Sequence, residues 1–152
     1  MKIVTIWLFV LYFLACGHNY QQQSMSIAVT NVKKAKVTLR IYSGRENPFW
    51  NLSEKQIGDL LALFGDLPRS EAFTLPDNLG YHGFRVELTE SAAEKTHEIA
   101  AYKGRVSYRS AKADQYFTDR EKRVEMFLLN SAGSLDEKLK KFVKDEITAE
   151  EK

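Results

Sequence analysis

One strand pattern followed closely by one helix pattern constrains the fold more than any other feature of this sequence. Over residues 37–42, apolar and polar side chains alternate, which is the period of a half-buried β-strand. Ser53 and Gln56 then form a capping-box pattern, and apolar residues recur at helical spacing over 57–64. An amphipathic strand and an amphipathic helix each need a partner layer, so a helix packed on a sheet is expected.

Further elements follow the same logic. Alternation over 84–88 predicts a second strand, and residues 99–108 predict a β-hairpin whose tight turn holds Gly104 at positive φ. A capping-box pattern over 118–121 predicts a helix that ends near Gly133.

A last helix is expected to open at residues 134–137. Its narrow apolar stripe comprises Leu135, Leu139, Phe142 and Val143. Alternation over 25–29 also suggests a short edge strand.

The composition is that of one ordinary domain. A chain of 152 residues with 44% apolar content can bury a core without disulfides and is too short for two full domains. The expected architecture is a single α+β domain over 34–147, with a mainly antiparallel sheet of about four strands and three helices on one face, and a disordered tail over 148–152. The 22 basic and 20 acidic residues give a net charge of +2, which argues against nucleic acid as a partner.

The amino-terminal stretch has the pattern of an export signal. Lys2 precedes a run from Ile3 to Ala15 in which only Thr5 is polar. This length suits the apolar region of a signal peptide and falls short of the roughly 20 residues that a spanning helix needs. Residues 1–15 are therefore interpreted as a signal peptide, with an uncleaved membrane anchor as the alternative.

The segment FLACG at residues 13–17 resembles the lipobox of bacterial lipoproteins. That resemblance implies a lipid on Cys16, a membrane attachment through it, and a location on the periplasmic side of a bacterial membrane. Phe13 stands where the pattern has Leu, Val or Ile, and cleavage after Gly17, which would give a secreted soluble protein, is the alternative. Cys16 is the only cysteine, and residues 16–33 then form a polar, flexible tether.

The segment SGRENPFW at residues 43–50 is the best candidate for a binding surface. It joins the strand to the helix, and Pro48 and Gly44 restrict its shape. We expect it to meet a second turn segment at one end of the sheet and to bind a small ligand or an envelope protein. The candidate binding residues are Arg45, Asn47, Trp50, Tyr81 and His82.

Each of these residues also has a purely structural alternative. Asn47 can build a turn, Arg45 can stack on Trp50, and Tyr81 can pack under a helix. Asn51 begins an N-glycosylation sequon, but Ser53 already has a sufficient role as a helix cap.

The two turn segments together resemble a family of uncharacterised small proteins. The family pattern is Ser-Gly-Arg-Pro-Asn-Pro-x-Trp and, downstream, Leu-Gly-Tyr-x-Gly-Phe; here it covers residues 43–50 and 79–84, with Glu46 in place of a proline. The likeness extends from Val37 to about Leu135 and implies one coherent domain. It implies no established activity, substrate or catalytic residue.

No catalytic, cofactor or metal motif is present in the sequence. There is no G-x-S-x-G, H-E-x-x-H, P-loop or C-x-x-C pattern, so we assign no catalytic residue, cofactor or metal ligand. His97 and Glu98 are adjacent on a predicted strand and should point to opposite faces. The sequence favours an exported, lipid-anchored, non-catalytic binding module. The alternatives are a small exported hydrolase with a site near His82 and a purely structural secreted domain.

Overall fold

The computed structural model describes residues 32–75, 80–90 and 96–149. The elements follow the chain in the order β1 (Val32–Leu39), β2 (Phe49–Asn51), α1 (Glu54–Gly65), β3 (Phe84–Glu90), β4 (Thr96–Tyr102), β5 (Arg105–Arg109), β6 (Asp114–Thr118), α2 (Arg123–Ser131) and α3 (Glu137–Thr148). None of the helices in these ranges combines the length and apolar content required to cross a membrane.

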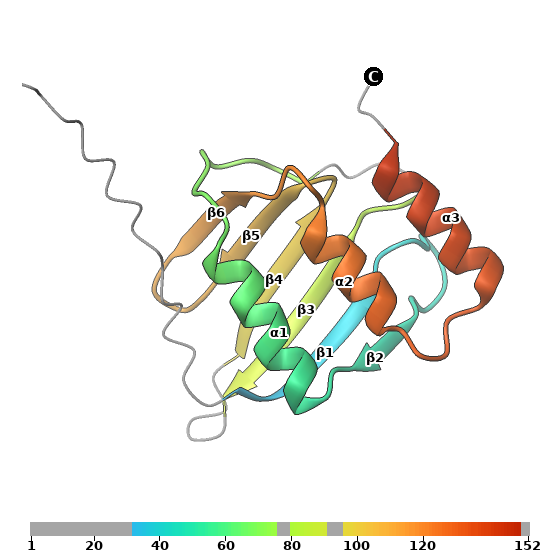
Figure 1. Ribbon diagram of the computed structural model, residues 1–152, viewed down its shortest axis with the longest axis horizontal. Coiled ribbons are helices and arrows are strands. Elements are labelled where there is room, and N and C mark those ends of the chain that lie inside the picture. Colours follow the sequence, from blue (N-terminus) through green and yellow to red (C-terminus); the bar gives the residue numbers. More distant parts are fainter. Residues whose placement is uncertain (1–31, 76–79, 91–95, 150–152) are drawn as a thin grey trace, which may run out of the picture.

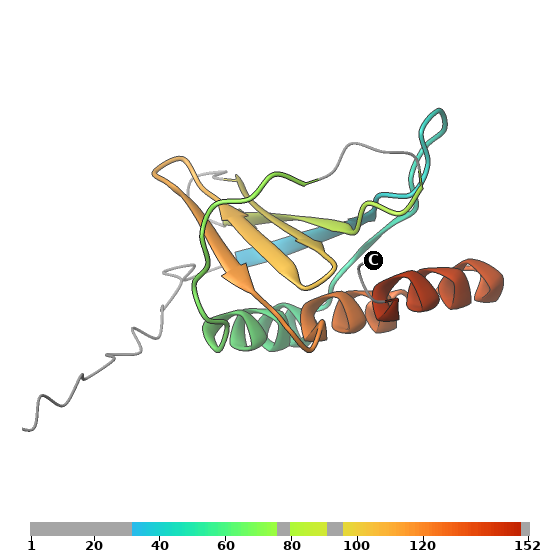
Figure 2. The ribbon, with the colours of Figure 1, turned by 90° about the horizontal axis from the view of Figure 1, so that it is seen from above.

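The strands form one antiparallel sheet in the order β2-β1-β3-β4-β5-β6. Helices α1 and α2 lie on one face of this sheet, and α3 lies in the same layer beside α2, as Figures 1 and 2 show. This arrangement confirms the predicted α+β class. Because β2 returns along the outer side of β1, the segment that joins them lies at one end of the sheet, next to the sheet edge.

The core lies between the sheet and the helices, as the alternation pattern predicts. Each strand directs every second side chain into it, and the helices contribute their apolar stripes. The largest buried apolar side chains are Phe64, Phe84, Phe117, Leu39, Leu60, Leu88, Ile99, Leu128, Leu129 and Ile147.

Helix α1 begins as its sequence pattern predicts. Ser53 Oγ accepts a hydrogen bond from the Gln56 N–H (3.3 Å), and the Ser53 N–H donates to Gln56 Oε1 (2.9 Å). This reciprocal pair satisfies two backbone donors that a helix start otherwise leaves open. The helix then buries Ile57, Leu60 and Phe64 against the sheet.

The predicted number of about four strands is wrong, because β2 and β6 were missed. β2 has only three residues and directly follows Pro48, so it shows too little alternation to be recognised. β6 buries a single apolar side chain, Phe117, and its pattern carries no periodic signal. Both strands pair with a neighbour, and each contributes one ring to the core, Trp50 or Phe117, which is too little for a periodic pattern.

The start of α2 also differs from its prediction. Thr118 ends β6, and the helix begins at Arg123 after Lys122, which adopts a left-handed conformation with φ 56°. The carboxylate of buried Asp119 accepts from the Val124 N–H (2.7 Å), so the acid one position after the predicted cap satisfies the helix start.

Helix α3 starts where it was expected, with Asp136 accepting from the Lys138 and Leu139 N–H groups. Its buried residues are Val143 and Ile147, whereas Phe142, which was placed in the stripe, is 47% exposed. α3 ends at Thr148, one residue beyond the predicted domain boundary.

The hairpin between β4 and β5 is confirmed, with Lys103 at φ 46° and Gly104 at φ 76°. These angles place both turn residues in the left-handed region, as a two-residue turn that matches strand twist requires.

The face of the sheet opposite the helices is crossed by the segment that follows α1 (Figure 2). The Thr118 N–H donates to Pro68 O (3.0 Å) and the Ser70 N–H donates to Tyr116 O (2.9 Å), so residues 68–70 cover the outer edge of β6. Phe73 then packs edge-on against Tyr116 at a ring-centroid separation of 5.2 Å.

β1 already includes Val32 and Lys33, which the predicted tether had contained. The predicted signal peptide, Cys16 and the strand suggested at 25–29 lie outside the described residues.

Candidate functional site

Asn47 closes the loop between β1 and β2. Its Oδ1 accepts hydrogen bonds from the Ile41 N–H (2.9 Å) and the Tyr42 N–H (2.8 Å). The side chain thus satisfies two backbone donors at the point where β1 stops pairing. This contact positions residues 48–50 along β1, where the Leu39 N–H donates to Pro48 O at 2.9 Å.

Arg45 lies at the exposed tip of the same loop. Its guanidinium carbon is 3.5 Å from the centroid of the Tyr42 ring, a cation–π contact. The sequence-based alternative placed Arg45 on Trp50, so the stacking partner differs from the prediction.

Trp50 belongs to both the core and the surface. Its ring packs edge-on against Phe84 with centroids 6.2 Å apart, and its indole N–H donates to Ser131 Oγ at 2.9 Å. Ser131 in turn donates to Leu128 O (2.7 Å). The indole is therefore held in one orientation by α2, with part of its surface exposed to solvent.

Tyr81 is buried in the core and contacts α2. Its hydroxyl donates to Glu125 Oε1 at 2.6 Å, and the second carboxylate oxygen accepts from the Gly104 N–H at 2.9 Å. Burial raises the pKa of Glu125, and it also raises the pKa of Tyr81. Tyr81 thus has the structural role that the sequence left open as an alternative.

His82 is half-buried, and its backbone N–H donates to Arg40 O at 2.8 Å. It does not line the pocket described below. The hydrolase alternative therefore gains no support from this pocket.

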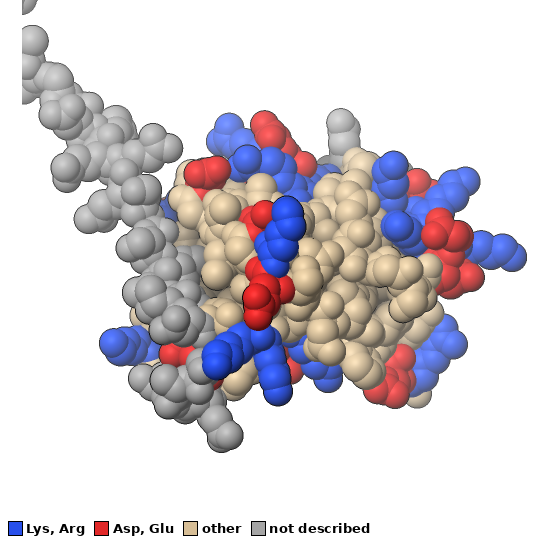
Figure 3. Space-filling view, turned by 60° about the horizontal axis from the view of Figure 1, so that its bottom comes forward, with Lys and Arg blue, Asp and Glu red and all other residues tan. Residues whose placement is uncertain are grey.

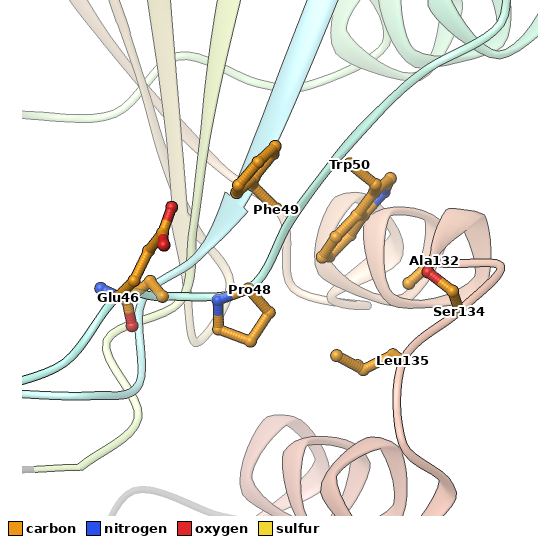
Figure 4. A pocket seen from close by; sticks show the side chains of 8 residues that line it. Glu46, Pro48, Phe49, Trp50, Ala132, Ser134 and Leu135 are labelled. Atoms are coloured by element: carbon orange, nitrogen blue, oxygen red, sulfur yellow. The ribbon is translucent and has the colours of Figure 1, made fainter.

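A pocket of about 320 Å³ opens beside β2. One wall comes from the loop and β2, and the other comes from the connection between α2 and α3 (Figure 4). The lining residues are Glu46, Asn47, Pro48, Phe49, Trp50, Ala132, Ser134 and Leu135. Sequence reasoning identified the first wall, but the second lies more than 80 positions away and gave no local signal.

Five of the eight lining residues are apolar, and Glu46, Asn47 and Ser134 are polar. Figure 4 shows Pro48 and Trp50 facing Ala132, Ser134 and Leu135, with Glu46 and Phe49 on the side of the sheet. Phe49 is 52% exposed, which makes it the most exposed large apolar side chain described, and Lys36 Nζ lies 4.5 Å from its ring centroid. On the face seen in Figure 3, acidic and basic side chains are interspersed, so no patch of one sign stands out there.

A second set of polar residues, Glu90, His97 and Tyr108, was not predicted from the sequence. His97 Nε2 lies 3.0 Å from Glu90 Oε1, and His97 Nδ1 lies 2.8 Å from the Tyr108 hydroxyl. Because a carboxylate can only accept, Nε2 carries the proton in the neutral ring and Tyr108 donates to Nδ1. Burial, followed by the charge of Glu90, raises the pKa of Tyr108, which keeps it a donor.

The pairing of β4 with β5 indicates that His97 and Tyr108 lie on the same face of the sheet. Ile99 pairs with Tyr108, so His97 lies two positions earlier on the same face. Glu98 points the other way, as predicted, and its carboxylate lies 3.2 Å from Arg85 Nε. No pocket-lining residue belongs to the Glu90–His97–Tyr108 group, and within the described ranges no cluster of three or more His, Cys, Asp or Glu could hold a metal ion.

The structure thus brings Asn47 and Trp50 to one pocket, places Arg45 near it at the loop tip, and leaves Tyr81 and His82 outside its lining. Comparisons with protein-family models, with curated proteins and with solved structures found no match for this chain.

Proposed function

We propose that this protein is an exported, lipid-anchored, non-catalytic binding module that takes an apolar group into the pocket beside β2. The observation that carries the proposal is the pocket itself. Five of its eight lining residues are apolar, and one of its walls is a loop that Asn47 holds through two hydrogen bonds. Concave apolar sites with a few polar groups are the usual form of ligand sites.

Two residues of the loop-side wall are held by hydrogen bonds. Trp50 is fixed by its hydrogen bond to Ser131, and Pro48 is fixed by its carbonyl contact with Leu39. A preorganised wall loses little conformational entropy on binding. Aromatic side chains of this kind are also enriched among residues that dominate binding energy.

Nuclear magnetic resonance on the full chain with Trp7→Phe tests the binding proposal. Trp50 is then the only tryptophan, so its indole N–H gives one resonance that reports on the pocket. We expect toluene and isoamyl alcohol, which mimic Phe and Leu side chains, to shift this resonance in a saturable way.

Ser134→Phe supplies the blocking variant, because Ser134 is exposed and lines the pocket. Ser43→Phe is the matched control, since Ser43 is exposed but does not line it. Ser134→Phe should abolish the shift and Ser43→Phe should leave it unchanged. Equal responses of the two variants would refute the pocket as the binding site.

Export and anchoring rest on residues 1–17 of the sequence, with the apolar run and the lipobox-like FLACG segment as support. The mass of the mature amino terminus tests this part. A diacylated or triacylated Cys16 is expected, whereas an unmodified Cys16 or a chain that starts after Gly17 would disprove the lipid anchor.

A further inference from the structure

The outer edge of β2 is left open beside the pocket. The Leu39 N–H donates to Pro48 O and the Leu52 N–H donates to Ala35 O, both at 2.9 Å. Pro48 and Leu52, which flank β2, therefore direct their backbone groups toward β1. Backbone groups of successive strand residues point to opposite sides. Phe49 and Asn51 therefore direct their N–H and C=O groups outward, where no described residue pairs with them.

The opposite edge of the sheet differs. Residues 68–70 pair with β6 and cover its outer side. Within the described ranges, β2 is thus the edge at which a further strand can be added. Open strand edges of this kind are used to bind extended peptides, with neighbouring pockets reading alternate side chains.

The charges at this site favour a basic partner. Glu46 is exposed, lines the pocket and forms no ion pair with any described residue. The positively charged Lys36 lies over the Phe49 ring and does not line the pocket, so Glu46 is the charged residue of the lining. A carboxylate beside the apolar lining residues fits a ligand in which an apolar side chain lies next to Lys or Arg.

We infer that the ligand of the proposed binding module is an extended polypeptide segment that adds to β2 as a further strand. Its backbone bonds to Phe49 and Asn51, an aliphatic or aromatic side chain enters the pocket beside Trp50, and a basic side chain pairs with Glu46. This inference rests on the proposed function, because it uses the same pocket.

A second copy of the chain fits this edge less well than a peptide does. β2 has three residues, of which only two present outward backbone groups, and a symmetric pair would join just these. Stable interfaces between proteins bury roughly 1,200–2,000 Å². A flexible peptide can follow the edge and fill the pocket at the same time.

The test uses one blocked heptapeptide, acetyl-Thr-Lys-Thr-Leu-Thr-Lys-Thr-amide, and two N-methylated forms of it. One form is methylated on the leucine and one lysine, and the other on the two central threonines. In an added strand only one edge of the peptide faces β2, so one methylated form should lose binding and the other should keep it. The full chain with Trp7→Phe is used, and binding is followed through the Trp50 indole resonance.

Two protein variants test the backbone contact of Asn51 and the ion pair of Glu46 separately. Asn51→Pro removes an outward N–H while the bonds to β1 remain, because proline is tolerated where an edge N–H faces solvent. This variant should raise the dissociation constant of the parent peptide about tenfold and leave toluene binding unchanged. Glu46→Gln should raise the dissociation constant of the lysine-containing peptide about threefold. It should leave the dissociation constant unchanged for a peptide in which norleucine replaces the lysines.

The outcomes distinguish this inference from the proposed function. If both methylated forms bind equally, or if the parent peptide fails to bind while toluene still shifts Trp50, strand addition is wrong and the pocket proposal stands. If neither toluene nor the peptide shifts Trp50, both fail. If sedimentation velocity shows a dimer that Asn51→Pro dissociates, the partner at the edge of β2 is a second copy of the chain and the peptide inference is wrong.

Discussion

The Tyr81 hydroxyl lies 2.6 Å from Glu125 Oε1, although 44 positions separate the two residues in the chain. This contact joins the turn before β3 to the first turns of α2, and the Gly104 N–H completes it from the β4–β5 turn. Three segments that are distant in sequence thus converge on one buried carboxyl group. Buried polar groups are tolerated when they are hydrogen-bonded, so these donors offset much of the cost of burying Glu125.

Glu125 should make stability depend on pH. Burial raises its pKa above the ordinary value, and the bonds from Tyr81 and Gly104 lower it by less. A raised folded-state pKa contributes stability below the ordinary pKa, and this contribution is lost as pH rises through the raised value. In urea denaturation at several pH values, Glu125→Gln should gain stability relative to the wild type as pH increases. A pH-independent difference would contradict this expectation.

Asn47 should hold the loop through its side-chain oxygen. Asn47→Ala leaves the Ile41 and Tyr42 N–H groups without their acceptor and should lower the free energy of unfolding by about 1–2 kcal/mol. Asn47→Asp is the matched control, because a carboxylate oxygen at the same place can accept both bonds. Chemical denaturation measures both variants. Equal destabilisation by alanine and aspartate would show that the two hydrogen bonds contribute little.

Gly83 should tolerate no side chain. It has φ +79°, and an added Cβ would lie 2.0 Å from Ala101 O in the neighbouring strand. Gly83→Ala should therefore cost more than about 3 kcal/mol. Gly80→Ala provides the comparison, since φ is +107° but no atom lies within 4 Å of the added Cβ. It should cost only about 1–2 kcal/mol of backbone strain. Thermal denaturation that ranks the two variants equally would refute the steric argument.

Lys122 should affect the free energy of unfolding through both its ammonium group and its backbone conformation. Nζ donates to Ile147 O (2.6 Å) and Ala149 O (3.1 Å), which caps the carboxyl end of α3, while φ is 56°. Lys122→Ala should lose about 1 kcal/mol through the missing cap.

Lys122→Gly also loses the cap but relieves the left-handed conformation, so it should be more stable than Lys122→Ala by about 1 kcal/mol. Urea denaturation of the two variants checks this order. An alanine variant as stable as the glycine variant would mean that the backbone at this position carries no strain.

The elements with strong local patterns were predictable. The capping box at Ser53 and Gln56 identified the start of α1, and the Lys103–Gly104 turn identified the hairpin between β4 and β5. β2 and β6 were not recognised, because each contributes one ring to the core, which is too little for a periodic pattern. The start of α2 was misplaced because the carboxylate of Asp119 reaches over five positions to Val124.

The candidate site was predictable in part. The loop around Asn47 and Trp50 was identified because glycine, proline and aromatic residues gather there. Tyr81 carried the same kind of signal, yet its hydroxyl has a buried partner, which no local pattern could indicate.

The sequence alone determined the α+β class, most helix and strand positions and the loop that forms one wall of the pocket. These depend on side-chain periodicity and turn chemistry within a few residues. Only the tertiary structure decided that Ala132 and Leu135 supply the second wall, that Glu125 receives the Tyr81 hydroxyl, and that β2 has an open edge. Such relations depend on which distant segments pack together, and packing is a property of the whole folded chain.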